Sequence, residues 1–172
     1  MNIVTSGVSG HRKFETGVED LGYLDLRILS LLQTDSRLSF NKIASELGIS
    51  VGTAFNHVKK LERAGVLKEY TIVLDSEKVG FGLTALILVQ VEGGHLVDVE
   101  SEIAKANNII AVYDITGDYD AAIVAKFKDR ADLSGFIKNI MSILYVKRTV
   151  TNVVLNVIKE DLGLKLQRTA YP

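Results

Sequence analysis

Polar and basic side chains recur between residues 50 and 63 at the spacing of one face of a helix. Asn56 could form two hydrogen bonds with the edge of an adenine, and Thr53 could bond a phosphate or touch a thymine methyl group. Basic side chains further along would neutralise phosphates, which supplies register and salt-dependent affinity. This chemistry is recognition of double-stranded DNA; the alternative is a solvated polar face on an ordinary helical bundle. The residues expected to contact DNA are Ser50, Gly52, Thr53, Asn56, His57, Lys59, Lys60 and Arg63.

A second group of chemically capable residues forms the short motif Thr116-Gly117-Asp118-Tyr119-Asp120. Its plainest role is a hairpin turn, in which the glycine adopts a positive φ and the aspartates bond local amides. Such a turn also exposes backbone N–H groups that can hold a carboxylate, and an aspartate can accept hydrogen bonds from an ammonium group. The motif therefore predicts a site for a small molecule that carries both groups, such as an amino acid.

Catalytic and metal-binding constellations are absent from the sequence. The three histidines, His11, His57 and His95, share no metal-ligand spacing, and the chain has no cysteine. Asp118 and Asp120 resemble a carboxylate pair, but the sequence places no nucleophile or base beside them. There is no glycine-rich phosphate loop and no Gly-x-Ser-x-Gly motif. We therefore expect no enzyme activity, no metal and no cofactor, apart from a small-molecule effector.

The composition is that of a folded protein of the cytoplasm. Hydrophobic residues make up 47% of the 172 residues and charged residues 24%, with a net charge of −1. Residues 21–74 have a net charge of +2 and residues 75–172 a net charge of −2, which weakly favours a DNA-facing first half. Apolar runs fall far short of the ~20 residues that a membrane helix needs. The start of the chain lacks the apolar core of a signal peptide.

Three short helices are predicted in the first half of the chain. Apolar residues at three- and four-residue steps indicate a helix over residues 21–32. A second helix follows Ser39, a predicted N-cap, and ends at Gly48, where a left-handed backbone conformation is available. Ser50 then caps a third helix. The β-branched segment 66–74 predicts a strand beside the bundle, which makes the whole a winged helix-turn-helix.

After a charged, glycine-containing linker the pattern changes to strands alternating with helices. Strands are predicted at residues 83–92, 109–116, 121–127 and 149–158, and helices at residues 96–106 and 133–144. The order βαββαβ is that of a ferredoxin-like domain, an α+β fold with two helices on one face of an antiparallel sheet. The predicted organisation is an arm (1–20), a winged helix-turn-helix domain (21–74), a linker (75–82), a ferredoxin-like domain (83–160) and a tail (161–172).

The first strand of the second domain is apolar on both faces. Ala85, Ile87 and Val89 alternate with Leu86 and Leu88. Because the two helices can cover only one face of the sheet, the other needs a partner, and the simplest partner is a second copy of the chain. A symmetric homodimer would also place two DNA-contacting helices about one turn of DNA, ~34 Å, apart.

Four motifs in this order resemble the Lrp/AsnC (leucine-responsive, feast/famine) family: LDLRILSLLQTDSR, IASELGIS, LERAGVLKEY and TGDYD. The resemblance extends over residues 24–159. It implies a transcriptional regulator that is dimeric or assembled into octamers as tetramers of dimers. It also implies a ligand, usually an amino acid, bound between dimers. On this resemblance, Thr149 and Thr151 join the turn at residues 116–120 in the effector site.

The chain departs from the family pattern in the helix expected to contact DNA. Gly52 stands where a polar residue is usual, His57 where an arginine is usual, and Phe55 where a bulky aromatic is rare. Histidine changes its charge near neutral pH, which arginine does not. Leu144-Tyr145-Val146 also replaces a segment that commonly contains proline and glycine. The operator sequence of a relative therefore cannot be transferred to this chain.

Two other functions fit the predicted fold. One is an enzyme or a plain small-molecule-binding module whose first domain serves assembly only, since ferredoxin-like domains host many functions. The cations and Asn56 of the third helix argue against it, because a bundle that does not bind DNA has no need of them. The other is an architectural protein that compacts DNA and senses nothing, which a bound metabolite would exclude.

Overall fold

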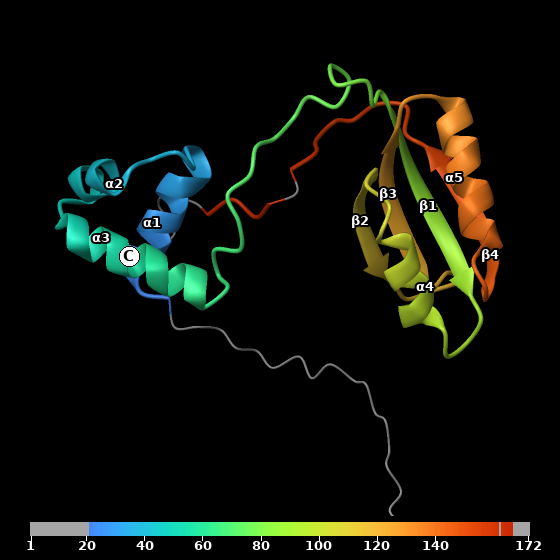
Figure 1. Ribbon diagram of the computed structural model, residues 1–172, viewed down its shortest axis with the longest axis horizontal. Helices are drawn as coiled ribbons and strands as arrows, with labels where there is room; N and C mark the ends of the chain where they lie inside the picture. Colours follow the sequence, from blue (N-terminus) through green and yellow to red (C-terminus); the bar gives the residue numbers. More distant parts are fainter. Residues whose placement is uncertain (1–20, 162, 167–172) are drawn as a thin grey trace, which may run out of the picture. The chain divides into compact units, whose positions relative to one another are not determined.

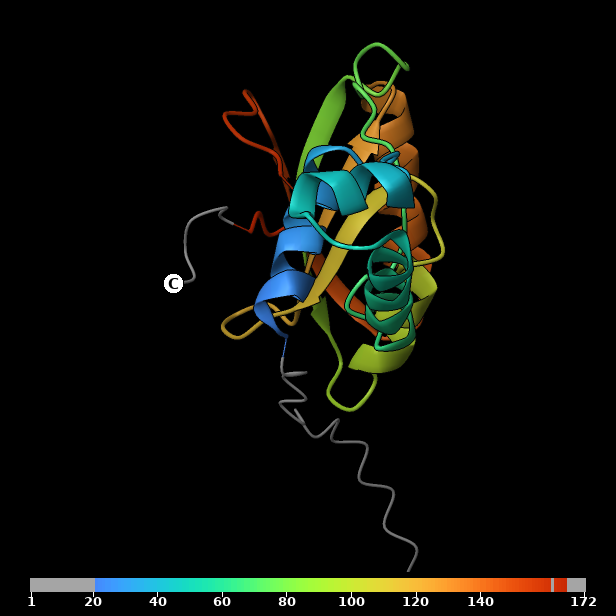
Figure 2. The same cartoon turned by 90° about the vertical axis from the view of Figure 1, so that its left-hand side faces the viewer.

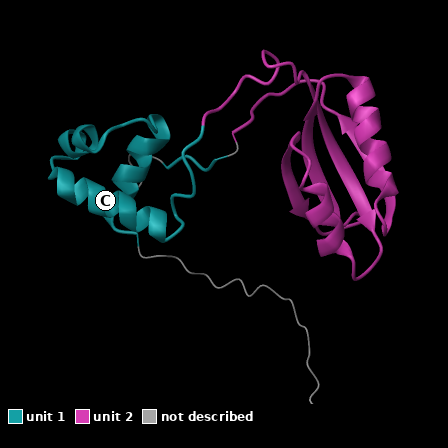
Figure 3. Cartoon of the chain, in the orientation of Figure 1, with its two compact units in different colours: residues 1–71, 162–172 teal, residues 72–161 magenta. Residues whose placement is uncertain are grey.

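The computed structural model describes residues 21–161 and 163–166, which form two compact units (Figure 3). Unit 1 holds the described chain up to residue 71 together with the segment 163–166, and unit 2 holds residues 72–161. The predicted N-terminal arm and the end of the predicted tail lie outside the described residues.

Unit 1 is built on three helices: α1 (Tyr23–Thr34), α2 (Phe40–Leu47) and α3 (Val51–Arg63) (Figure 1). The predicted caps are confirmed, because the Ser39 side chain accepts a hydrogen bond from the amide of Lys42 and the Ser50 side chain accepts one from the amide of Thr53. Gly48 ends α2 with a φ of 66°. These bonds satisfy amides that the start of a helix leaves unpaired, so the helix limits follow from local chemistry.

Helix α1 begins and ends two residues later than predicted. At the start, the Asp25 side chain accepts a hydrogen bond from the amide of Gly22, which makes Gly22 the N-cap. At the end, the amide of Asp35 donates to the carbonyl of Leu31, so the helical bonding continues through Thr34. Its apolar stripe packs with α2 and α3 into one core. The fully buried members of that core are Ile28, Leu32, Ile43, Ala44, Ala54, Val58 and Leu61.

The strand predicted over residues 66–74 is wrong, since this segment forms no β-strand in the structure. Val66 and Leu67 pack against the core of unit 1, whereas Val73 is 96% exposed. β-branched residues favour extended backbone, but a strand is defined by hydrogen bonds to a second strand. The composition of one segment indicates an extended backbone and does not decide whether such a ladder forms.

The segment 163–166 belongs to unit 1 because it bonds to α1. The side-chain amide of Gln33 donates to the carbonyl of Leu164 at 2.6 Å and accepts from the amide of Leu166 at 2.9 Å. One glutamine side chain thus bonds to the backbone on both sides of Lys165, once as a donor and once as an acceptor. The chain therefore connects to unit 1 both before and after unit 2.

Unit 2 is a four-stranded antiparallel sheet with two helices. Its elements are β1 (Leu83–Val91), α4 (Leu96–Ile103), β2 (Ile109–Asp114), β3 (Ala121–Phe127), α5 (Arg130–Ser142) and β4 (Val146–Val153). The strand order is β2-β3-β1-β4, and both helices lie on the same side of the sheet (Figures 1 and 2). This confirms the predicted ferredoxin-like βαββαβ arrangement and, with the helices of unit 1, the α+β fold class.

The last strand was predicted at residues 149–158 but begins at Val146 and ends at Val153. It pairs with β1 from Val146 opposite Val91 to Val153 opposite Ala85. Because β1 itself begins at Leu83, the pairing stops just after the amide of Val154 bonds to the carbonyl of Thr84. The apolar residues Leu155, Val157 and Ile158 are consequently exposed, although their composition favours a strand.

The two faces of the sheet have different environments. Ala85, Ile87 and Val89 face α4 and α5 and are fully buried. Between them Leu86 pairs with Val124 and Asn152, and Leu88 pairs with Ala122 and Val150. We call this second side the open face; it carries Leu86, Leu88, Tyr113, Val124 and Val150.

Lys126 is the buried cation at one end of the open face. Its ammonium group donates to the Ser76 hydroxyl at 3.0 Å and to the Glu160 carboxylate at 2.5 Å. The segment entering β1 and the segment leaving β4 are therefore held by the same side chain. Burial of this lysine is tolerated because both partners are hydrogen-bonded to it.

Candidate DNA-reading helix and effector turn

Helix α3 divides its side chains between the core and a polar surface. Ala54, Val58 and Leu61 are buried against α1 and α2. At its N-terminus the Ser50 and Thr53 hydroxyls lie 2.8 Å apart, so both predicted DNA contacts also serve the cap. Bonds of this kind hold the first turn rigid without removing all of the hydroxyls' hydrogen-bonding capacity.

The outer side of α3 presents the groups predicted to contact DNA. Gly52, Asn56 and Arg63 are exposed, and no hydrogen bond of the Asn56 side chain is formed with the described residues. The Arg63 guanidinium donates to the carbonyl of Lys59, and Lys59 pairs with Glu62 at 2.6 Å. Exposed pairs of this kind contribute little stability, so their side chains can exchange a neighbouring carboxylate for a phosphate.

Two of the predicted contacts, His57 and Lys60, are bonded to a carboxylate that the sequence interpretation missed. Asp25 of α1 is 1% exposed and accepts hydrogen bonds from His57 Nδ1 at 2.6 Å and from Lys60 Nζ at 3.0 Å. Burial alone would raise the pKa of Asp25, but the hydrogen bonds from His57, Lys60 and the Gly22 amide lower it below its ordinary value of 3.8. The carboxylate is therefore ionised at neutral pH. A signal was available, since Asp25 precedes Ile28 and Leu32 by steps that put it on the buried stripe.

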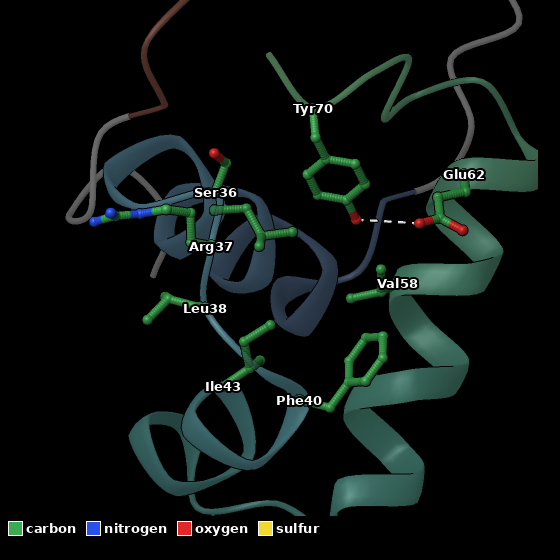
Figure 4. A pocket seen from close by; sticks show the side chains of 9 residues that line it. Ser36, Arg37, Leu38, Phe40, Ile43, Val58, Glu62 and Tyr70 are labelled. Atoms are coloured by element: carbon green, nitrogen blue, oxygen red, sulfur yellow. Dashed lines mark hydrogen bonds between the residues drawn. The ribbon is translucent and has the colours of Figure 1, made fainter. Parts of the chain in front are cut away.

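A cavity of about 310 Å³ lies on the other flank of α3, between α2, the turn before it and Tyr70 (Figure 4). Leu38, Phe40, Ile43 and Val58 supply much of its apolar lining. At its rim the Tyr70 hydroxyl donates to Glu62 at 3.1 Å. Burial and the hydrogen bond to Glu62 raise the pKa of Tyr70, while the hydrogen bond from Lys59 and then that from Tyr70 lower the pKa of Glu62. The hydrogen bond between Tyr70 and Glu62 thus connects the segment after α3 to the helix.

The predicted effector turn joins β2 to β3. Gly117 has a φ of 119°, and the amide of Ile115 donates to the carbonyl of Asp120, as the turn chemistry required. The Asp120 carboxylate accepts from the amide of Val91 at 2.8 Å, so it is used to hold the end of β1. Asp118 is exposed. The structure therefore separates the two aspartates of the motif into one that is bonded within the sheet and one that faces solvent.

Thr149 and Thr151 lie on β4, on the helix-covered side of the sheet. Thr149 is opposite Val89 and Thr151 is opposite Ile87, while the amide of Asp120 bonds to the carbonyl of Val89 from the other side of β1. Since neighbouring strands are ~4.8 Å apart, Thr149 lies within about 10 Å of the start of β3. The structure thus brings the turn and Thr149 to the same end of the sheet, with Thr151 one step further along.

The same end of unit 2 carries an aromatic stack that the sequence interpretation did not identify. The rings of His95 and Tyr145 are 3.5 Å apart and inclined by 4°. Tyr145 adopts a φ of 75°, a conformation that favours glycine, and its carbonyl accepts from the amide of Glu92. The stack and this bond hold the tyrosine in place, which explains how the chain dispenses with the glycine usual before the last strand.

Glu100 of α4 is a carboxylate with one oxygen, Oε1, that has no bonded partner among the described residues. Burial, and to a lesser extent the charge of Asp114, raise its pKa above the ordinary value of 4.5. The folded protein therefore holds this proton more tightly than the unfolded chain, and stability falls as pH rises through the folded-state pKa.

Replacing Glu100 by glutamine is expected to raise the free energy of unfolding of unit 2 at pH 7.5 by about 1 kcal/mol, because a half-buried charge whose Oε1 atom has no partner among the described residues disappears. The gain should vanish near pH 4, where the glutamate is itself neutral. Urea unfolding of both proteins at the two pH values measures this. Glu102→Gln, at an exposed position of the same helix, is the matched control, and an equal gain there would contradict the argument.

Metal ligands do not cluster in the described part of the chain. No three histidine or acidic side chains there approach one another as ligands of a metal ion. Within the same residues no helix has the length and apolar character to cross a membrane.

Comparison with known proteins places both units in one family. Residues 21–68 match the model of a winged helix-turn-helix DNA-binding domain, and residues 84–164 match that of the Lrp/AsnC ligand binding domain. An uncharacterized HTH-type transcriptional regulator of Pyrococcus abyssi is 43% identical over 145 residues, which cover 84% of this chain and 99% of the relative. The HTH-type transcriptional regulator FL11 of Pyrococcus horikoshii is 34% identical over 147 residues, or 86% of this chain and 97% of that protein.

A solved structure shows the same arrangement. The crystal structure of a transcriptional regulator of Neisseria meningitidis in complex with L-Met matches with a TM-score of 0.77 and 26% identity, covering 84% of this chain and 96% of that one. These proteins are described as regulators of transcription. The helix-turn-helix of unit 1, the ferredoxin-like unit 2 and the matches to both domain models lead to one conclusion: the chain belongs to the Lrp/AsnC family and is a DNA-binding transcriptional regulator with a ligand-binding domain.

Proposed function

We propose that the protein binds operator DNA as a symmetric dimer, or as an octamer built from four dimers, and that an amino acid bound to unit 2 alters this binding. The observation that carries the proposal is the outer side of α3, where Asn56 is exposed beside three basic side chains. Because its target is the chromosome, we place the protein in the cytoplasm.

Asn56 is the residue best suited to sequence recognition. Its amide can donate to and accept from an adenine edge in the major groove, and it makes no competing bond with the described residues. Gly52, one helical turn earlier, leaves room for the helix to approach the DNA closely, since a Cβ there would meet only the Ser50 hydroxyl at 3.8 Å. Lys59 and Arg63 lie further along the helix and are suited to phosphates.

Replacing both Lys59 and Arg63 by alanine is expected to weaken DNA binding at low salt by about tenfold or more. The slope of log K against log salt should also fall, by ~0.9 for each phosphate that is no longer neutralised. These two are a cleaner choice than Lys60, which is bonded to buried Asp25. Fluorescence anisotropy with a labelled duplex across a salt series measures the slope. Lys105→Ala, just after α4 of unit 2, is the control. An unchanged slope in the double variant would refute the assignment of α3 to DNA.

The open face supports assembly. Leu86 and Leu88 lie at its centre on β1, with Val124 and Val150 on the two neighbouring strands. A second copy placed across a two-fold axis would cover this apolar surface with the same surface. Two copies of α3 would then be available for two half-sites, which a monomer cannot offer.

The effector turn has groups for both ends of an amino acid. The exposed residues Thr116 and Gly117 offer a hydroxyl and backbone amides to a carboxylate, and Asp118 offers an exposed carboxylate to an ammonium group. Asp120 uses its Oδ2 atom to accept from the amide of Val91, so we assign it to fixing the turn rather than to the ammonium group. The L-Met bound to the Neisseria meningitidis regulator supports an amino acid as the class of ligand.

A further inference from the structure

A buried carboxylate on α1 is hydrogen-bonded to two side chains of α3, the helix proposed to contact DNA. Asp25 is 1% exposed, so it makes no contact with DNA itself. Its Oδ1 atom lies 2.6 Å from His57 Nδ1, and its Oδ2 atom lies 3.0 Å from Lys60 Nζ. These two bonds join α1 to the polar side of α3.

The partner of Nδ1 determines the chemistry of the other ring nitrogen. An ionised carboxylate can only accept hydrogen bonds, so Nδ1 must carry a hydrogen whether the ring is neutral or charged. The change on titration therefore falls on Nε2. In the neutral ring Nε2 is an acceptor, and in the imidazolium it is an N–H donor with a positive charge nearby.

The His57 side chain keeps a route to the outside of unit 1. It is 31% exposed, and Nε2 has no hydrogen bond to the described residues of that unit. A phosphate oxygen is an acceptor and carries negative charge, so it is attracted to the protonated ring and repelled by the Nε2 lone pair of the neutral one. An arginine at this position would donate at every pH.

We propose that Asp25 is a positioning residue for the recognition helix α3 and that, through it, His57 donates a hydrogen bond to a DNA phosphate only while its ring is protonated. DNA affinity is then higher where the ring is protonated than where it is neutral. The proposal rests on the proposed function, since it requires α3 to lie against DNA.

Other charges near the ring do not produce the same dependence. The charged groups bonded in this cluster are Asp25 from α1, which contacts the ring, and Lys60 from α3, which shares the same carboxylate. The charges of α2 include Lys42 and Glu46, which pair with each other at an exposed surface. Carboxylates and lysines ordinarily keep their charge between pH 6 and pH 8.5, so a pH dependence that is lost when His57 alone is replaced belongs to the imidazole.

The test measures binding of the full chain to one labelled duplex, selected from a random-sequence pool by the wild-type protein, at pH 6.0 and pH 8.5 and constant salt. We expect the wild type to bind about tenfold more tightly at the lower pH, the effect of one charge-assisted hydrogen bond. His57→Arg should bind tightly at both pH values, and His57→Gln should bind weakly at both. Histidines elsewhere in the chain are common to all three proteins and cancel in the comparison.

A double-mutant cycle tests the role of Asp25 separately. Asp25→Asn, His57→Gln and the double variant should show coupling in DNA affinity of about tenfold at pH 6.0 and none at pH 8.5. Release of Lys60 by Asp25→Asn occurs in both arms and cancels. If Asp25→Asn leaves unit 1 unfolded by circular dichroism, the two His57 variants, which retain Asp25, still decide the pH dependence.

The outcomes separate the two proposals. Binding of the wild type that is as independent of pH as that of His57→Arg overturns the inference and leaves the proposed function standing. Equal coupling between Asp25 and His57 at both pH values would contradict the proposal that Asp25 positions His57 for a bond made only by the protonated ring. Absence of binding to any selected duplex at either pH overturns the proposed function and this inference with it.

Discussion

Replacing Leu88 by aspartate is expected to give a folded monomer, because it disrupts the proposed assembly through the open face. Leu88 lies on the middle strand β1, between Ala122 of β3 and Val150 of β4, at the centre of the open face. In a dimer across this face the new carboxylate would be buried beside its own copy, among the apolar side chains of the face. Burying a charge in an apolar surface costs several kcal/mol, and ~3 kcal/mol already changes a dissociation constant by more than 100-fold.

The monomer itself should tolerate the change, because Leu88 is only half-buried in the single chain. Sedimentation velocity gives the mass, and circular dichroism shows whether the fold is retained. Loss of the dimer should also lower affinity for a duplex with two half-sites far more than for one with a single half-site. Val97→Asp is the matched control, since Val97 is equally apolar and 74% exposed on α4, on the other side of the sheet. A wild-type mass for Leu88→Asp would contradict assembly through the open face.

The second large effect concerns the two aspartates of the effector turn. Asp120→Ala is expected to lower the free energy of unfolding by about 2 kcal/mol, because the Val91 amide loses its charged acceptor. For a domain of this size that corresponds to a fall in Tm of roughly 10 °C. Asp118→Ala should leave the Tm of the free protein unchanged, since its side chain is exposed, and should abolish the response to the effector.

Thermal unfolding of the wild type with each of the twenty amino acids identifies the effector, which should stabilise by about 2.7 kcal/mol at a hundred times its Kd. The same measurement on Asp118→Ala and Asp120→Ala then distinguishes loss of effector binding from loss of stability. Each variant is the control for the other. Equal loss of stability in both variants would show that the division of roles is wrong. No change in Tm or assembly size with any amino acid would remove the effector proposal.

The limits of α2 and the start of α3 were predictable because they depend on bonds between near neighbours. Ser39 and Ser50 bond to amides three residues ahead, and Gly48 supplies the left-handed conformation itself. The order of strands and helices in unit 2 was also predictable from local pattern. Apolar residues alternate along a strand, whereas along a helix they recur every three or four residues. The open face followed as well, because β1 alternates between two apolar sets and two helices can cover only one.

Features that join distant parts of the chain were missed or misplaced. The limits of β4 depend on where β1 begins and ends, and the segment 66–74 has the composition of a strand but forms none. Asp25 is separated from His57 by 32 residues, so only packing of α1 against α3 brings them together. Tyr145 gave a local signal, by replacing a glycine-containing segment, but its stacking partner His95 lies on another element.

The sequence by itself determined the family, the two domain types and which helix presents Asn56 and its neighbouring cations, because caps, turns and apolar periods are local properties. The tertiary structure decided how those residues are divided. His57 and Lys60 are bonded to a buried carboxylate, whereas Asn56 is exposed. Asp120 is bonded to the end of β1, whereas Asp118 is exposed to solvent. The physical reason is that a side chain's remaining hydrogen-bonding capacity depends on which distant groups packing has already placed against it.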